Sequence, residues 1–131
     1  MRSRIFEGIV AVALAGAVGT AASQAQEPTE GGARIEQGSQ VYEYWCEPCH
    51  GPGLGLPGFG GLPGTQQLAI KYRDSDVPAV LDERTDLVPA FIETIVRQGV
   101  SFMPQFRKTE ISDADLEALN AYLTRNNPSS R

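Results

Sequence analysis

The sequence predicts an all-α fold, and three observations support this prediction. Apolar side chains recur every three or four residues in several segments, which is the spacing of one face of a helix. Residues that begin and end helices flank the later segments. In contrast, no segment alternates apolar and polar residues over the length of a strand. We therefore expect three to five helices that pack on one another.

The first 25 residues have the features of a secretory signal peptide. Arg2 and Arg4 precede the apolar run IVAVALAGAV, and small residues follow up to Ala25. A basic start, an apolar stretch and a small-residue cleavage site characterise such a signal. The run is shorter than the ~20 apolar residues that a spanning helix needs. We therefore expect cleavage near Ala25, export to the periplasm, and no stable membrane insertion of the mature chain.

The remaining residues are predicted to form one domain. Residues 26–33 (QEPTEGGA) are polar and contain proline and glycine, which indicates a flexible lead-in. The domain is expected over residues 34–126, with a tail at 127–131, because about 100 residues build one modest core. The net charge of −5 argues against nucleic acid as a partner.

A predicted helix over residues 34–45 leads directly into the cysteines. Gly38, Tyr42 and Cys46 are spaced four apart and therefore lie on one helix face. The Gly/Pro loop, defined here as residues 51–64, is half glycine with three prolines, so it cannot continue the helix. Apolar residues recur in this loop, which predicts that it covers a surface: Leu54, Leu56, Phe59 and Leu62.

Three further helices are predicted after the Gly/Pro loop. A short one is expected over residues 65–72, and the connector at 73–86 has room for one more turn. Pro89 suits the first turn of the next helix, which closes at Gly99. Ser112 is a favourable N-cap for the last helix. The apolar stripe of that helix consists of Leu116, Leu119, Tyr122 and Leu123.

The stretch WCEPCH holds both cysteines of the chain, Cys46 and Cys49, and its single histidine, His50. The spacing C-x-x-C-H is typical of c-type haem attachment. Two thiols three positions apart can form thioethers with the two vinyl groups on one haem edge, and the next imidazole can then reach the iron. We therefore expect one covalently bound haem c, with His50 as an axial iron ligand.

Met103 is the candidate for the second axial ligand. Methionine commonly fills this position in electron-carrying c-type cytochromes. Since Met1 leaves with the signal peptide, Met103 is the only methionine of the mature chain, and no second histidine competes with it. With His50 and Met103 both bound, the iron has no position for a substrate. The expected function is one-electron transfer rather than enzymatic catalysis.

Other readings of these residues remain. A haem-free thiol–disulfide oxidoreductase would use Cys46 and Cys49, but its C-x-x-C is expected at a helix N-terminus near a βαβ pattern. A plain disulfide suits an exported chain but explains neither His50 nor the glycine-rich loop. Structural zinc normally takes four Cys or His ligands, and the chain offers three. A haem sensor or peroxidase in which Met103 leaves the iron is also open.

These motifs together resemble the class I c-type cytochromes over roughly residues 35–123. The resemblance is carried by Gly38-x-x-x-Tyr42-x-x-x-Cys46, CEPCHG, the Gly/Pro loop, VRQGVSFMP and LNAYL. It implies a cytochrome c fold wrapped around one haem, in which the first and last helices cross closely at Gly38. It also implies that electrons pass through an exposed haem edge near the Gly/Pro loop and Met103.

The resemblance further implies that a proline carbonyl in the loop accepts the Nδ1–H of His50. Pro57 and Pro63 are the candidates, and Pro63 is preferred. The segment at 65–88 is longer than is usual for the family, which leaves the partners of the haem propionates open. The candidates for that role are Trp45, Tyr72, Arg73 and Arg84.

The stretch IVRQGVSFMPQF is similar to the small cytochrome subunits of flavoproteins that oxidise alkylphenols or other alcohols. This similarity adds a second interpretation of the function, a dedicated cytochrome subunit of a periplasmic flavoprotein dehydrogenase. The first interpretation is a free carrier between a redox donor and an acceptor such as a terminal oxidase or another cytochrome. Neither the donor, the acceptor nor the reduction potential follows from the sequence.

Overall fold

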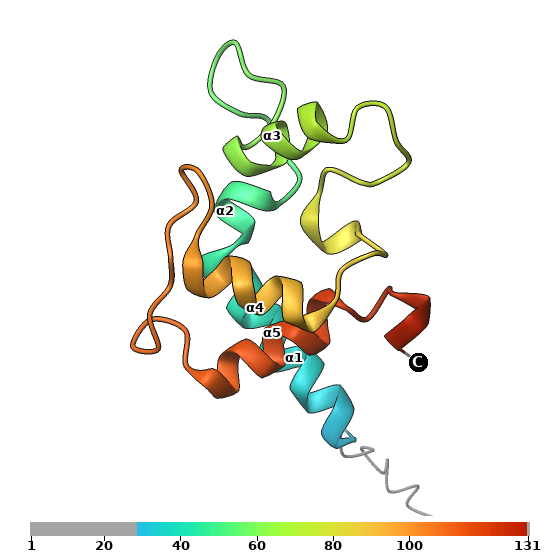
Figure 1. Cartoon of the computed structure of the whole chain (residues 1–131), viewed down its shortest axis with the longest axis vertical. Coiled ribbons are helices and arrows are strands. Elements are labelled where there is room, and N and C mark those ends of the chain that lie inside the picture. The colour runs from blue at the N-terminus through green and yellow to red at the C-terminus, as the bar shows by residue number, and fades with distance from the viewer. Residues whose placement is uncertain (1–28, 131) are drawn as a thin grey trace, which may run out of the picture.

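The computed structural model describes residues 29–130. Over these residues the chain forms helices and loops without a named strand, which confirms the all-α prediction (Figure 1). None of these helices is both long enough and apolar enough to span a membrane. The predicted signal peptide lies outside the described residues. The elements are α1 (Glu30–Trp45), α2 (Glu47–His50), α3 (Pro63–Lys71), η1 (Leu81–Glu83), α4 (Pro89–Gln98), α5 (Asp113–Leu123) and η2 (Pro128–Ser130).

Helices α1 and α5 cross in close contact at Gly38. A Cβ atom at this position would collide with the main-chain carbonyl of Ala118 and would lie 2.7 Å from the Cβ of Tyr122. One turn further along α1, the Tyr42 ring packs against the Tyr122 ring with centroids 5.4 Å apart. Gly38 therefore lies against the last helix, as expected, and its lack of a side chain permits the crossing.

Helical and buried residues are found on both sides of the range 34–126. Helix α1 begins at Glu30, so residues 30–33 of the expected lead-in are helical. Thr29 caps this helix by accepting a hydrogen bond from the Gly32 amide at 3.3 Å. At the other end, Asn127 was predicted to belong to a tail but is buried. Its Nδ2 donates to the Leu87 carbonyl oxygen at 2.8 Å.

The later helices follow the sequence signals closely. Helix α4 starts at Pro89 and is closed by Gly99, whose positive φ of 67° is one that glycine adopts readily. Ser112 caps α5, and its side chain accepts a hydrogen bond from the Asp115 amide at 3.1 Å. Helix α3 begins at Pro63, two residues before the predicted start. The Gly/Pro loop therefore ends inside the first turn of α3.

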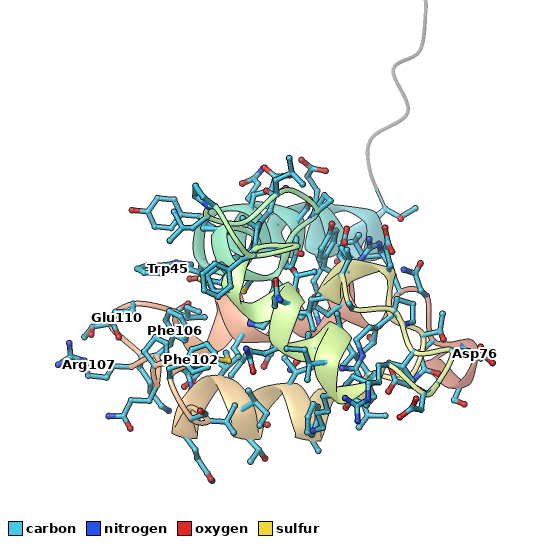
Figure 2. All side chains as sticks on the ribbon, turned by 90° about the horizontal axis from the view of Figure 1, so that it is seen from above. Trp45, Asp76, Phe102, Phe106, Arg107 and Glu110 are labelled. Atoms are coloured by element: carbon cyan, nitrogen blue, oxygen red, sulfur yellow. The ribbon has the colours of Figure 1, made fainter. Side chains whose placement is uncertain are left out.

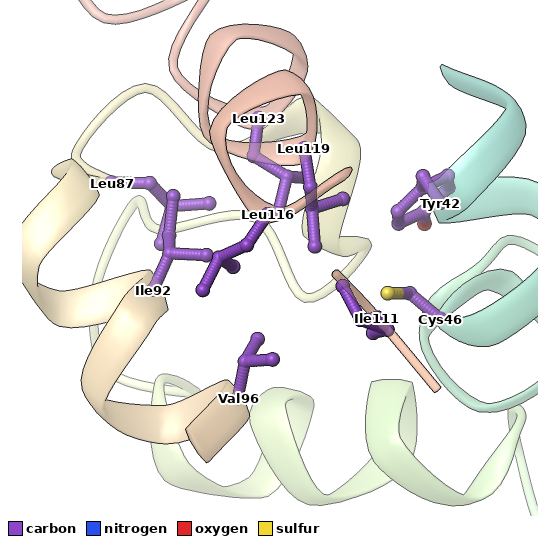
Figure 3. Close-up of a cluster of buried hydrophobic side chains, with 9 residues drawn as sticks. All are labelled: Tyr42, Cys46, Leu87, Ile92, Val96, Ile111, Leu116, Leu119 and Leu123. Atoms are coloured by element: carbon purple, nitrogen blue, oxygen red, sulfur yellow. The ribbon is translucent and has the colours of Figure 1, made fainter. Parts of the chain in front are cut away.

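The apolar core lies between α1, α4 and α5 (Figure 3). Ile111 and Leu119 are fully buried in it. Cys46 and Tyr42 belong to the same cluster, so the segment with the two cysteines is attached directly to the core. The other members of the cluster are Leu87, Ile92, Val96, Leu116 and Leu123. Burial of each such aliphatic side chain contributes about 1.5–3 kcal/mol, which makes the core a stable base for the site.

Candidate functional site

The two cysteines lie one helical turn apart at the end of α1 and in α2. The amides of Cys49 and His50 both donate to the Cys46 carbonyl oxygen, at 3.1 and 2.8 Å. Pro48 stands in the first turn of α2, where a missing N–H does no harm. Both thiols are free; Cys46 is buried and Cys49 is exposed. The short helix thus presents one sulfur at the core and one at the surface, with His50 directly after them.

The imidazole of His50 rests on the backbone at the start of α3. A Cβ atom at Gly64 would lie 2.5 Å from its Cε1 and 2.6 Å from its Nδ1, so only glycine allows this approach. The Nδ1 atom is buried and has no hydrogen-bond partner among the described residues. Burial lowers the pKa of His50, which favours the neutral imidazole that binds metals.

Two hydroxyl groups hold the backbone around His50. Tyr42 donates its hydroxyl to the His50 carbonyl oxygen at 3.3 Å, and Thr65 donates to the Gly51 carbonyl oxygen at 2.8 Å. Burial raises the pKa of Tyr42 far above its ordinary value, so this donor keeps its proton. The turn that carries His50 is therefore fixed from α1 on one side and from α3 on the other.

The Met103 loop, defined as residues 99–112, connects α4 to α5. Its first part is a tight turn in which the Val100 amide donates to the Met103 carbonyl oxygen at 3.1 Å and the Met103 amide donates back at 2.9 Å. Ser101 within it has a positive φ of 55°, which is uncommon for a residue other than glycine. Gly99 permits the turn, since a Cβ there would lie 2.6 Å from the Met103 carbonyl oxygen.

A hollow of about 290 Å³ lies between the Gly/Pro loop, the start of α3 and the Met103 loop, although neither His50 nor Met103 lines it. Phe102, next to Met103, lines the hollow together with Pro63, next to the Gly64 that contacts His50. Its remaining wall consists of Leu56, Phe59, Gly61, Gln66 and Gln67. Phe102 also lies on the same side of the molecule as Phe106 and Trp45 (Figure 2).

The match to known families agrees with this arrangement. A family model described as cytochrome c oxidase, cbb3-type, subunit III matches residues 33–123. The chain belongs to this family. It is thus a class I c-type cytochrome, and its domain binds haem c and transfers electrons rather than catalysing a reaction. No curated protein and no solved structure matched the chain.

The residues of this cytochrome fit a bound haem. Three large apolar side chains line the hollow, namely Leu56, Phe59 and Phe102, and they give it the apolar surroundings that a haem requires. The site also contains the His50 imidazole, whose Nδ1 is buried and has no partner among the described residues, and two thiols on one helical turn. Among residues 29–130, no group of three or more His, Cys, Asp or Glu side chains could hold a bare metal ion.

The thiols of this cytochrome are poorly suited to disulfide exchange. Burial, together with the neighbouring Cys49, raises the pKa of the Cys46 thiol to about 12. Reactive cysteines of thiol–disulfide enzymes need a lowered pKa, because the thiolate is the nucleophile. In contrast, the positions of Cys46 and Cys49 beside His50 are those that haem attachment requires. The geometry therefore disfavours the haem-free alternative.

The structure shows what the candidate partners of His50 Nδ1 and of the haem propionates contact. Pro63 begins α3 and lines the hollow, but no proline oxygen is paired with Nδ1 of His50, so that hydrogen bond stays a prediction. Arg84 is buried, bonds both carboxylate oxygens of Asp86 at 2.8 and 2.6 Å, and stacks on the Tyr72 ring. The other two candidates are also engaged, Arg73 with exposed Asp74 and Trp45 with the Phe106 ring.

Sequence reasoning did not identify Gly64 and Thr65 as residues that position His50. The sequence pattern points to Pro63 but not to the two residues after it, because nothing local indicates that α3 packs its first turn on the imidazole. The capping glycine of α4 was visible, but its contact with the Met103 backbone was not. The contact of Gly64 with His50 joins two helices that the Gly/Pro loop separates in the sequence.

Proposed function

We propose that this cytochrome carries a single haem c, bound covalently through Cys46 and Cys49, with His50 and Met103 as axial iron ligands. The observation that supports this most strongly is the His50 imidazole, whose buried Nδ1 lacks a partner among the described residues and whose ring rests on Gly64. Bound haem supplies one iron that alternates between Fe(II) and Fe(III). Ligation by both side chains leaves no coordination position for a substrate, so the protein carries one electron at a time.

The side chains around the site keep its geometry nearly constant during this exchange. Tyr42 and Thr65 restrain the carbonyl groups of His50 and Gly51, and the turn at Val100 restrains Met103. A fixed ligand set keeps the structural change between the two oxidation states small. The soft thioether of Met103 favours the reduced iron and raises the potential.

The experiment that tests this proposal is expression of the full precursor with a c-type maturation system, followed by acid–acetone extraction. We expect the red colour to stay with the polypeptide and the intact mass to rise by that of one haem. A double variant, Cys46→Ser with Cys49→Ser, is the matched control and should release its colour or accumulate none. A colourless wild-type protein with two titratable thiols would contradict the proposal and favour disulfide exchange.

We further propose that the mature protein works in the periplasm after removal of residues 1–25. The proposal depends on the basic start, the apolar run and the small residues before Gln26. N-terminal sequencing of protein from the periplasmic fraction should begin within a few residues of Gln26. An intact N-terminus on membrane-bound protein would contradict it.

For the partner, we propose that redox proteins dock on the apolar rim, defined as Leu54, Leu56, Phe59 and Phe102. These four side chains are between 58% and 88% exposed. A weak redox encounter buries little area, so the rim is sufficient for a free carrier. The same rim supports the second candidate function, a dedicated subunit of a flavin-dependent alcohol or alkylphenol dehydrogenase, because a lasting contact buries more apolar surface.

The two functions differ in how docking responds to salt. The full chain has a net charge of −5, so an acidic free carrier would associate more slowly with a basic partner as salt rises. A dedicated subunit would co-purify with its flavoprotein at high salt. Purification of the native protein from its source at low and at high salt distinguishes the two functions.

A further inference from the structure

We propose that Arg97 is a positioning residue that holds the Met103 loop in its ligating conformation. Arg97 lies in the last turn of α4, directly before the loop begins. The inference rests on the proposed function, because it assumes that Met103 binds the iron. According to this inference, the position of the loop depends on one guanidinium group as well as on the turn around Met103.

The guanidinium joins the second half of the Met103 loop, and the start of α5, to α4. Its Nη1 donates to the carbonyl oxygens of Phe106 and Ile111 at 3.1 and 2.8 Å. Its Nη2 donates to the Ser112 carbonyl oxygen at 3.4 Å and to an Asp113 carboxylate oxygen at 3.0 Å. Only 20% of the Arg97 side chain is exposed, so these bonds are partly shielded from water.

Backbone hydrogen bonds fix both ends of the segment that contains Met103. The loop leaves α4 at Gly99, whose amide donates to the Ile95 carbonyl oxygen at 2.8 Å. It returns at Phe106, whose amide donates to the Val96 carbonyl oxygen at 2.8 Å and whose own carbonyl accepts from Arg97. Met103 stands between these two anchors, so the place where the loop returns determines how far its side chain reaches.

Between the two anchors, the segment is held by the two backbone hydrogen bonds between Val100 and Met103. Phe102 is 65% exposed, and Ser101 has the unfavourable positive φ. Backbone strain of this kind persists only where the surroundings enforce it. Without Arg97, the return of the loop depends on the Phe106 amide and on the packing of the Phe106 ring against Trp45. We therefore expect Met103 to leave the iron more often when the guanidinium is absent.

Lysine cannot replace Arg97 fully. The planar guanidinium offers five donors in a fixed fork, whereas an ammonium group is a single flexible point charge. Arg97 uses its fork on three carbonyl groups and one carboxylate. The variant Arg97→Lys should therefore keep the charge near Asp113 but only part of the hold on the loop.

The test measures how well added imidazole displaces Met103 from the ferric holoprotein of Arg97→Gln, Arg97→Lys and the wild type. We expect imidazole to bind Arg97→Gln about tenfold more tightly than the wild type, since charge-assisted hydrogen bonds are lost from the closed form alone. Arg97→Lys should lie between the two. The near-infrared sulfur-to-iron band should weaken in the same order, and the reduction potential should fall.

The matched control is Arg107→Gln, in the same loop. The Arg107 side chain is 75% exposed and pairs with Glu110 at 3.6 Å, so its removal should leave the imidazole affinity unchanged. Urea unfolding is measured in parallel. If Arg97→Gln and Arg97→Lys lose stability but bind imidazole like the wild type, Arg97 is merely structural and the inference is wrong. If the wild type itself lacks the near-infrared band, the proposed ligation by Met103 fails instead.

Discussion

The two segments that carry the proposed iron ligands are held in different ways. His50 lies on a short helix beside both cysteines, and it is contacted from α1 by Tyr42 and from α3 by Gly64. Met103 lies in a loop between α4 and α5, and its position depends on the turn at Val100 and on Arg97. The first ligand is therefore fixed by contacts from two other helices, and the second by a local turn and by one guanidinium group at the end of the preceding helix.

This difference predicts two kinds of failure. Changes around His50 should reduce the amount of protein that acquires and keeps haem, because they disturb the attachment turn itself. Changes in the Met103 loop should leave the haem attached while the sixth ligand, and with it the potential, changes. The predictions below compare the two regions, from the largest expected effect to the smallest.

Gly64→Ala should give the largest effect. The added methyl would lie 2.5 Å from the imidazole of His50 and 2.9 Å from the Cys49 carbonyl oxygen, and such overpacking costs about 3 kcal/mol. We expect a strong loss of haem-containing protein after expression, measured as haem absorbance per polypeptide. Gly60→Ala is the control, since the nearest atom to its Cβ would be 3.8 Å away; an equal loss in both variants would remove the special role of Gly64.

Gly99→Ala should disturb the other ligand. Its φ of 67° is strained for alanine, and the methyl would lie 2.6 Å from the Met103 carbonyl oxygen; we expect a cost of about 2 kcal/mol. The haem should stay covalently attached, while the near-infrared band of the oxidised protein weakens. An unchanged band together with loss of haem would show instead that Gly99 affects haem attachment and not the ligation by Met103.

Thr65→Val should have a smaller effect. It removes the hydroxyl that donates to the Gly51 carbonyl oxygen at 2.8 Å while keeping the volume of the side chain, and it should cost about 1 kcal/mol. Urea unfolding of the holoprotein measures this loss. The near-infrared band should not change, because the residue acts on the His50 side; a weakened band would show that the two regions are coupled.

Asp86→Asn should change stability alone, because the hydrogen bonds of its carboxylate go to Arg84 and to neither ligand segment. The hydrogen bonds from Arg84 hold the pKa of Asp86 below its usual range. The pair therefore stabilises the fold at pH values above about 4, and this contribution is lost as the pH falls through the lowered pKa. Because the carboxylate is half exposed, the neutral-pH loss should be about 1 kcal/mol or less.

The measurement is urea unfolding of the wild type and Asp86→Asn between pH 3 and pH 7. The two stability curves should approach each other toward the acid end. Parallel curves over the whole range would mean that the carboxylate charge contributes nothing. A change in the visible spectrum at neutral pH would place Asp86 closer to the haem than its contacts indicate.

The parts of the fold that follow from local chemistry were predictable from the sequence. Pro89, Gly99 and Ser112 mark helix ends by backbone geometry and capping alone, and the structure places α4 and α5 where they indicate. The start of α1 was not predictable in this way, because two glycines argue against helix while Thr29 caps it. The closeness of α1 to α5 was expected only through the resemblance, since a helical glycine by itself does not name its partner.

The residues of the candidate site also differ in whether local sequence predicts them. Cys46, Cys49 and His50 are adjacent in the chain, so their shared role is visible as a motif. In contrast, three other residues act on partners 14 positions away in the sequence. Gly64 contacts His50, Thr65 donates to Gly51, and Arg97 donates to Ile111. Such contacts depend on how helices pack, which no local pattern encodes.

The near-infrared absorption of the purified, oxidised holoprotein tests the central claim most directly, because the sulfur-to-iron band appears only when a methionine sulfur binds ferric haem. The account predicts this band in the wild type and its loss in Met103→Leu, with the haem still attached to the polypeptide in both proteins. A wild-type protein that retains its haem without the band would contradict ligation by Met103.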